Sequence, residues 1–121
     1  MKPIIIADDE DSMRTTFARF IRRYSKTEVD EVGDGVDLVE RVRQGDYSLV
    51  FTDNDMPSMS GLTAIIKIRE FNKSIPICMV SGDKADKVRP EAMGVGATDY
   101  IDKGDEDSVG HLKRTVEKYA D

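Results

Sequence analysis

Three short runs of apolar residues constrain the fold of this chain more than any other feature of its sequence. The runs occupy residues 4–6, 49–51 and 77–80, and none of them contains a charged side chain. Short, continuously apolar runs are typical of strands that are covered on both faces, as in parallel sheets. The sequence therefore predicts a parallel β-sheet with helices on both of its sides.

The segments between these runs change to a helical period. Five apolar residues between positions 13 and 24 fall at spacings of four, three, one and three, which places them on one face of a helix. The same kind of pattern recurs in residues 38–42, 62–66 and 109–119. Asp34 precedes the first of these and is the predicted N-cap of its helix.

Two weaker strand patterns, residues 27–32 and 98–102, complete five repeats of a strand followed by a helix. Such alternation predicts right-handed crossovers and one doubly wound α/β domain over residues 1–121. The fourth helix is irregular, because Pro90 lies inside residues 84–93 and biases Arg89 away from helical angles. We predict that this helix begins late, near Pro90.

Composition and charge narrow the class of function. The net charge of -6 opposes direct binding to nucleic acid, whose phosphates attract clustered lysine and arginine. No apolar stretch approaches the ~20 residues that span a bilayer and no signal peptide is evident, so we expect a cytoplasmic protein without membrane contact. Cys78, the single cysteine, is interpreted as a buried apolar residue. His111, the single histidine, lies on the last predicted helix and is interpreted as a solvated or a helix-surface residue.

Polar residues follow the predicted strands directly. In an open parallel sheet, ligands bind beyond the carboxyl ends of the strands, so side chains at these positions are candidates for a binding site. The candidates are Asp8, Asp9, Asp53, Asp55, Ser81 and Lys103. Taken one at a time, each is more simply interpreted as part of a solvated turn. Only their joint position at the ends of neighbouring strands indicates a function.

Carboxylates gathered at that edge need a compensating positive charge. Two of them ~4 Å apart repel by about 4 kcal/mol at an effective dielectric constant of ~20. A hard divalent cation, Mg²⁺ or Mn²⁺, suits oxygen ligands, and Lys103 supplies a second positive charge. Such a site is suited to phosphoryl transfer, in which positioning and charge neutralisation do most of the catalysis, with Asp53 as the attacking group.

The segment Asp53-Asn54-Asp55-Met56-Pro57-Ser58-Met59-Ser60-Gly61 resembles the phosphoacceptor segment of response regulator receiver domains in two-component systems. The resemblance extends over essentially the whole chain and includes the single-domain, chemotaxis-type regulators. It implies a five-stranded, flavodoxin-like sheet in the order 2-1-3-4-5 with helices on both faces. It also implies that Asp53 takes a phosphoryl group from a sensor histidine kinase or a histidine phosphotransfer protein.

The resemblance further implies a signalling domain rather than an enzyme that acts on external substrates. Such a domain catalyses only its own Mg²⁺-dependent phosphorylation and dephosphorylation. Its phosphorylated form is expected to present a switched surface to a downstream protein or an output domain, as a monomer or as a phosphorylation-dependent dimer. The kinase, the stimulus and the output partner are not specified by the sequence.

A role for each metal-site residue is implied in the same way. Asp9 and Asp53 are expected to bind Mg²⁺ directly, Asp8 through a water molecule, and Asp55 through its main-chain carbonyl. Asp55 and Asp83 are also expected to flank the path of the water that hydrolyses the acyl phosphate.

Beside the metal, Ser81 and Lys103 are expected to contact the phosphoryl group. Tyr100 stands where receivers often carry an aromatic residue that turns inward on phosphorylation; simple packing in a strand is the alternative. Three positions depart from the family pattern, because Ser81 replaces a threonine, Ser60 replaces an acid, and Gly104 replaces a proline in a cis peptide. We expect neither serine to abolish phosphorylation, whereas Gly104 leaves the rigidity of its turn open.

Two other functions compete with phosphoryl acceptance. A Mg²⁺-dependent phosphatase with an aspartyl nucleophile would act on external substrates, but 121 residues leave no room for a cap domain that selects them. A pseudo-receiver would bind its partner without phosphate, and the full set of acceptor residues argues against that function.

Overall fold

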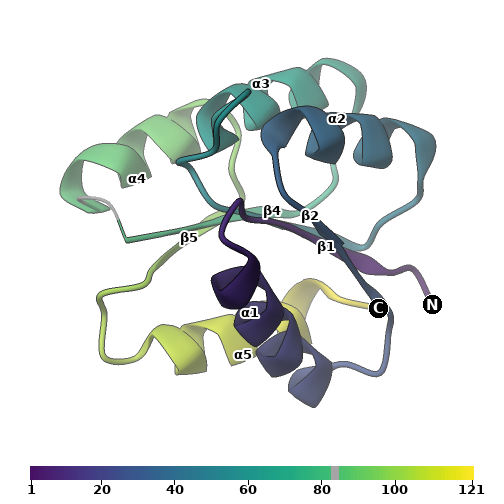
Figure 1. The fold of residues 1–121 in the computed structure, drawn as a ribbon, viewed down its shortest axis with the longest axis vertical. Coiled ribbons are helices and arrows are strands. Elements are labelled where there is room, and N and C mark those ends of the chain that lie inside the picture. The colour runs from purple at the N-terminus through teal and green to yellow at the C-terminus, as the bar shows by residue number, and fades with distance from the viewer. Residues whose placement is uncertain (83–84) are drawn as a thin grey trace.

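A computed structural model describes residues 1–82 and 85–121 as an alternating series of strands and helices (Figure 1). The strands are β1 (Ile4–Ala7), β2 (Val29–Val32), β3 (Leu49–Thr52), β4 (Ile77–Ser81) and β5 (Asp99–Asp102). The helices are α1 (Asp11–Tyr24), α2 (Gly35–Gln44), α3 (Gly61–Phe71), α4 (Ala85–Gly94) and α5 (Ser108–Tyr119). The strands form one parallel sheet in the order β2-β1-β3-β4-β5. The predicted doubly wound α/β fold is confirmed.

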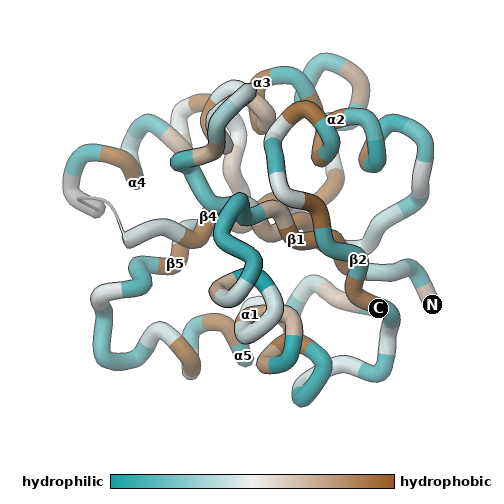
Figure 2. The backbone as a smooth tube through the Cα atoms, viewed as in Figure 1, coloured by the Kyte–Doolittle hydropathy of each residue, from teal (hydrophilic) through white to brown (hydrophobic). Residues whose placement is uncertain are grey.

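The sheet separates two hydrophobic layers. Helices α2, α3 and α4 cover one face, and α1 and α5 cover the other (Figure 1). The side chains of successive strand residues point alternately into the two hydrophobic layers, so Ile5 packs with α2 and α3 while Ile4 packs with α1 and α5. Figure 2 accordingly shows hydrophobic residues along the central strands and hydrophilic ones on the outward turns of the helices. Both faces of the central strands are therefore buried from solvent, which explains why the sequences of these strands are continuously apolar.

Cys78 lies in the layer that faces α1 and α5. Its side chain is buried, and burial raises the pKa of the thiol well above its ordinary value. The interpretation of Cys78 as a packing residue is confirmed, because a thiol held in its neutral form is a small apolar group.

Side-chain caps fix the starts of α2 and α3. The Asp34 carboxylate accepts a hydrogen bond from the backbone N–H of Val36 at 3.1 Å, which confirms the predicted N-cap. The Ser60 hydroxyl accepts one from the N–H of Thr63 at 3.2 Å. Each cap satisfies a backbone donor that the first turn of a helix leaves without a partner.

Helix α4 corrects the sequence prediction, because it begins at Ala85 and contains Pro90 in its interior. Proline removes one backbone hydrogen bond and crowds the preceding turn, but packing opposes that cost here. Ala92 is fully buried, and Val88, one turn earlier on the same face, packs against the same layer as Tyr100. None of the helices formed by the described residues has both the length and the apolar character that crossing a bilayer requires.

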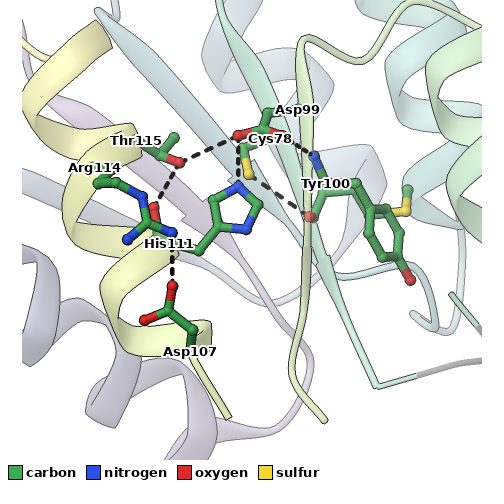
Figure 3. A network of polar contacts seen from close by, with 8 residues as sticks. Cys78, Asp99, Tyr100, Asp107, His111, Arg114 and Thr115 are labelled. Carbon is green, nitrogen blue, oxygen red and sulfur yellow. Dashed lines mark hydrogen bonds and ion pairs between the residues drawn. The ribbon is translucent and has the colours of Figure 1, made fainter. Parts of the chain in front are cut away.

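A polar network joins α5 to β5 through His111 (Figure 3). His111 Nε2 lies 2.8 Å from Asp99 Oδ2, and the Thr115 hydroxyl lies 3.3 Å from the same oxygen. A second pair, Arg114 with Asp107 at 2.8 Å, joins α5 to the residue that precedes it. His111 is therefore half-buried on the surface of α5 and bound to the edge strand, a contact that the sequence did not predict.

Candidate functional site

The predicted site residues come together at the carboxyl edge of the sheet because of the strand register. Ala7 of β1 pairs with Thr52 of β3, so the residues that follow them, Asp8 and Asp53, lie side by side. The N–H of Asp53 donates to the Ala7 carbonyl at 2.9 Å, which extends the ladder to the acceptor itself. The backbone pairing of the two strands therefore places Asp8 and Asp53 next to each other, independently of any side-chain contact.

Three carboxylates gather at this edge. One oxygen each from Asp8, Asp9 and Asp53 lies within 4.8 Å of the other two. The side chain of Asp8 is buried, that of Asp53 is half-buried and Asp9 is exposed, so the cluster opens toward solvent on one side. Carboxylate oxygens that converge in this way, with one side open to water, are the donor set that Mg²⁺ and Mn²⁺ prefer. The residues present therefore fit a hard divalent cation.

Lys103 contributes the positive charge that the carboxylates require. Its Nζ lies 3.6 Å from Asp8 Oδ2 and 3.6 Å from Asp53 Oδ2. The N–H of Lys103 donates to the Ser81 carbonyl at 3.0 Å, and the N–H of Gly104 donates to Asp102 Oδ1 at 2.9 Å. The peptide bond before Gly104 is trans, and these two hydrogen bonds link the turn to the ends of β4 and β5.

The environment of Asp53 works against its negative charge. Burial is the largest effect and raises the pKa of the carboxyl, and the charges of Asp8 and Asp55 act in the same direction. Lys103 and the Asn54 N–H, which donates to Asp53 Oδ1 at 2.7 Å, oppose that rise without cancelling it. The pKa of Asp53 therefore lies above its ordinary value, and a cation bound nearby would favour the ionised form.

The loop after Asp53 is held by backbone contacts that leave no room for larger side chains. A Cβ at Gly61 would collide with the Asp53 carbonyl oxygen, and one at Gly35 would collide with the Met59 carbonyl oxygen. The main-chain carbonyl of Asn54 accepts a hydrogen bond from the N–H of Gly61 at 2.9 Å, which joins the two ends of this loop. Glycine ends the acceptor segment because the helix approaches the strand end this closely.

The remaining predicted residues surround this centre. Ser81 ends β4 and is buried, whereas the Asp55 side chain is exposed. Tyr100 is only 2% exposed, and its ring points away from the His111 network (Figure 3). The guanidinium carbon of Arg89 lies 5.2 Å from the centre of that ring. Asp83, expected to flank the water path, lies outside the described residues.

Sequence reasoning did not single out Arg14, which contacts this site from α1. Its Nη1 donates to the carbonyl oxygen of Asp8 at 2.7 Å. The spacing of Asp11 and Arg14 predicts an ion pair within the helix, and that pair is present at 2.8 Å. No sequence pattern reveals the contact with the Asp8 carbonyl, because a carbonyl accepts in the same way whatever side chain the residue carries.

The amino-acid sequence matches the family described as "response regulator receiver domain" over residues 4–112. Among curated proteins, the transcriptional regulatory protein SrrA of Staphylococcus aureus is 33% identical over 100 residues. Those residues are 83% of this chain and 41% of SrrA, so the chain spans less than half of that relative.

Solved structures share the fold over nearly the whole chain. The response regulator TrrA of Thermotoga maritima, in complex with Mg²⁺-BeF, is 26% identical with a TM-score of 0.85, and 98% of each chain is covered. The chemotaxis response regulator CheY4 of Vibrio cholerae has a TM-score of 0.84 at 22% identity, again with 98% of each chain covered. The second likeness is in the fold alone.

Proposed function

The chain belongs to the response regulator receiver domain family of two-component systems, and from this premise we propose that Asp53 is its phosphoryl acceptor. The observation that carries the proposal is the position of Asp53. Its carboxylate is half-buried beside Asp8 and Asp9, with the Lys103 ammonium 3.6 Å away. No other carboxylate among the described residues combines a place in that cluster with a place in the family's acceptor segment.

Four residues are proposed to hold the divalent cation. The carboxylates of Asp8, Asp9 and Asp53 and the main-chain carbonyl of Asp55 are the candidates, and the convergence of the three carboxylates supports the set. Bound there, Mg²⁺ or Mn²⁺ neutralises charge on the carboxylates and on the incoming phosphoryl oxygens. TrrA, the relative of known structure described above, was crystallised with Mg²⁺-BeF.

The transfer itself exchanges one bond to phosphorus for another. An Asp53 carboxylate oxygen forms a bond to phosphorus while the P–N bond to the donor histidine breaks. The electron pair of that bond returns to the imidazole, which leaves as a neutral ring because its other nitrogen carries a proton. Lys103 and the Ser81 hydroxyl then bind the phosphoryl oxygens, which carry the charge of the transition state. Neither residue needs to move a proton at Asp53, because the acceptor is used as the carboxylate.

The phosphodonor is proposed to be a sensor histidine kinase or a histidine phosphotransfer protein. The partner that binds the phosphorylated form is a downstream protein or an output domain. Tyr100 is the candidate switch residue. Its burial beside Arg89, in the hydrophobic layer that also contains Val88 of α4, supports this role. The domain acts on its own Asp53 and releases no product from external phosphomonoesters.

Mass spectrometry tests the acceptor directly. Incubation with acetyl phosphate or phosphoramidate and Mg²⁺ is expected to add one phosphoryl group, and EDTA is expected to prevent it. Asp53→Asn should abolish the addition. Asp46→Asn, which removes an exposed acid that pairs with Lys2 far from the cluster, should leave it intact. Phosphorylation of Asp53→Asn at the wild-type level would contradict the proposal, as would multiple-turnover hydrolysis of small phosphomonoesters.

A further inference from the structure

Arg14 makes three polar contacts from the first turns of α1. Nη1 donates to the Asp8 carbonyl at 2.7 Å and Nη2 donates to Asp11 Oδ1 at 2.8 Å, while Nε lies 3.4 Å from Glu31 Oε1 on β2 as an ion-pair contact without a hydrogen bond. The side chain is only 17% exposed. The planar guanidinium therefore joins the loop after β1, the helix α1 and the edge strand β2 through one rigid group.

The carbonyl that Arg14 binds belongs to the peptide unit between Asp8 and Asp9. A peptide unit is planar, so fixing the direction of its carbonyl limits how both neighbouring residues can rotate. The rest of Asp8 is held as well, since its N–H donates to the Val32 carbonyl at 3.1 Å and its carboxylate accepts from the Glu10 N–H at 3.0 Å. The contact with Arg14 extends this restraint to the peptide unit that joins Asp8 to Asp9, and so to the backbone that carries the Asp9 side chain.

Arg14 and Lys103 contact different groups at the site. The Arg14 guanidinium binds the main-chain carbonyl of Asp8, whereas the Lys103 ammonium lies 3.6 Å from the carboxylates of Asp8 and Asp53. On the side away from that carbonyl, Arg14 contacts Asp11 and Glu31, and Glu31 also contacts Arg22. The contact of Arg14 with the site is therefore one that fixes the direction of a peptide unit, while Lys103 offsets carboxylate charge.

From these contacts we infer that Arg14 is a positioning residue for the divalent-cation site, holding the Asp8–Asp9 peptide unit so that both carboxylates face the cation. The inference rests on the proposed function, because it assumes a cation at Asp8, Asp9 and Asp53. It assigns to α1 and β2 a part in the affinity for the metal, although neither element supplies a ligand.

Metal affinity is the measurement that tests this role. In Arg14→Met, the dissociation constant for Mg²⁺ by titration calorimetry, and for Mn²⁺ by electron paramagnetic resonance, is expected to rise about ten-fold, as for other groups that orient metal ligands. Arg22→Met is the matched control, because Arg22 lies on the same helix and also contacts Glu31, at 3.6 Å, without touching Asp8. Its affinity should equal that of the wild type.

Arg14→Lys tests whether the planar geometry of the guanidinium, rather than its charge alone, is needed for metal affinity. One ammonium keeps the charge but cannot hold the carbonyl and both acids in the same arrangement, so most of the loss in affinity should remain. Phosphorylation of both Arg14 variants by acetyl phosphate should approach the wild-type level once Mg²⁺ is raised to saturation, since Asp53 and Lys103 are unchanged. Circular dichroism and thermal unfolding confirm that each variant is folded at the assay temperature.

The possible failures are distinguishable. Wild-type metal affinity in a folded Arg14→Met or Arg14→Lys would overturn the inference alone, and so would an equal loss of affinity in Arg22→Met. A wild-type protein that binds Mg²⁺ but takes no phosphoryl group at Asp53 would overturn the proposed function and leave the positioning test valid. A wild-type protein that binds no divalent cation would overturn both.

Discussion

Asp53 sits in surroundings that disfavour the charge on which its proposed chemistry depends. Burial is the main reason that its pKa is raised, and the neighbouring Asp8 adds to it, while Lys103 only partly offsets the effect. The native state therefore holds a proton on Asp53 more tightly than the unfolded chain does. Ionisation of this residue at neutral pH costs stability when no cation is bound.

Replacing Asp53 by asparagine should therefore stabilise the fold at neutral pH in the presence of EDTA. The gain should shrink as the pH falls through the raised pKa of Asp53, and should vanish below the ordinary aspartate pKa, where the wild-type carboxyl is protonated in both states. Thermal unfolding at a series of pH values measures this difference. Asp46→Asn, which removes an exposed acid, should show no comparable gain. A lower midpoint for Asp53→Asn at pH 7 would contradict the prediction.

Among individual residues, the sequence could place Asp8, Asp9 and Asp53, because they come at or just after the ends of clearly apolar runs, and Lys103, because it follows the weaker strand pattern of residues 98–102. It could not find contacts that depend on backbone groups or on distant elements. Arg14 was missed because its partner is a main-chain carbonyl. The contact of His111 was missed because Asp99, its partner, lies on another element whose register only the fold reveals.

The loop between β3 and α3 shows how one element depends on another. Asp34, which caps α2, also accepts hydrogen bonds through Oδ1 from the N–H groups of Ser58 at 3.1 Å and Met59 at 3.3 Å. Burial is the largest single influence on this carboxyl and would raise its pKa, but the backbone N–H groups that bind it together outweigh burial. The pKa of Asp34 is consequently lowered, and its negative charge helps to hold the acceptor loop against α2.

Asp34→Ala should cost more stability than the loss of a simple cap. We expect about 2 kcal/mol for Asp34→Ala and about 1 kcal/mol for Ser60→Ala, whose hydroxyl accepts from one backbone N–H, at Thr63. Because the folded pKa of Asp34 is lowered, its contribution is present above the ordinary aspartate pKa and is lost as the pH falls through the lowered value. Chemical denaturation at neutral and acidic pH measures both effects.

Asp34→Asn provides the control for charge, because it keeps an accepting oxygen and removes the titration. It should retain part of the stability and lose the part of the pH dependence that Asp34 contributes. Equal losses in Asp34→Ala and Ser60→Ala would show that the contacts with Ser58 and Met59 contribute nothing.

Among the elements, those with clean apolar periods were predictable, and the errors lie where tertiary packing decides. Strands β2 and β5 begin at Val29 and Asp99, later than the predicted starts at residues 27 and 98. Helix α4 starts before Pro90 because Ala92 and its neighbours are packed against the sheet, and that packing cannot be read from the local sequence.

At the scale of the whole molecule, five strands deliver their ends to one edge, and a cation bound there would act on the stability of the entire domain. A ligand that binds the native state alone stabilises it by about 2.7 kcal/mol at a free concentration about one hundred times its dissociation constant. The strand order was predictable from the family resemblance, whereas the alternation of strands and helices alone indicated only a doubly wound sheet.

Mg²⁺ should therefore raise the thermal midpoint of the wild-type protein relative to NaCl at matched ionic strength. Asp9→Asn should lose most of this rise, because Asp9 is exposed and its replacement removes a candidate ligand without disturbing the core. Asp46→Asn should keep the full rise. An undiminished effect of Mg²⁺ on Asp9→Asn would place the cation elsewhere.

The three crowded carboxylates also bear on engineering of this chain. Stabilising substitutions are common, and those at a functional site often sacrifice activity. A library selected only for thermal stability is therefore expected to accumulate replacements of Asp53. An engineer who wants to keep phosphoryl acceptance would exclude Asp8, Asp9 and Asp53 from the mutated positions.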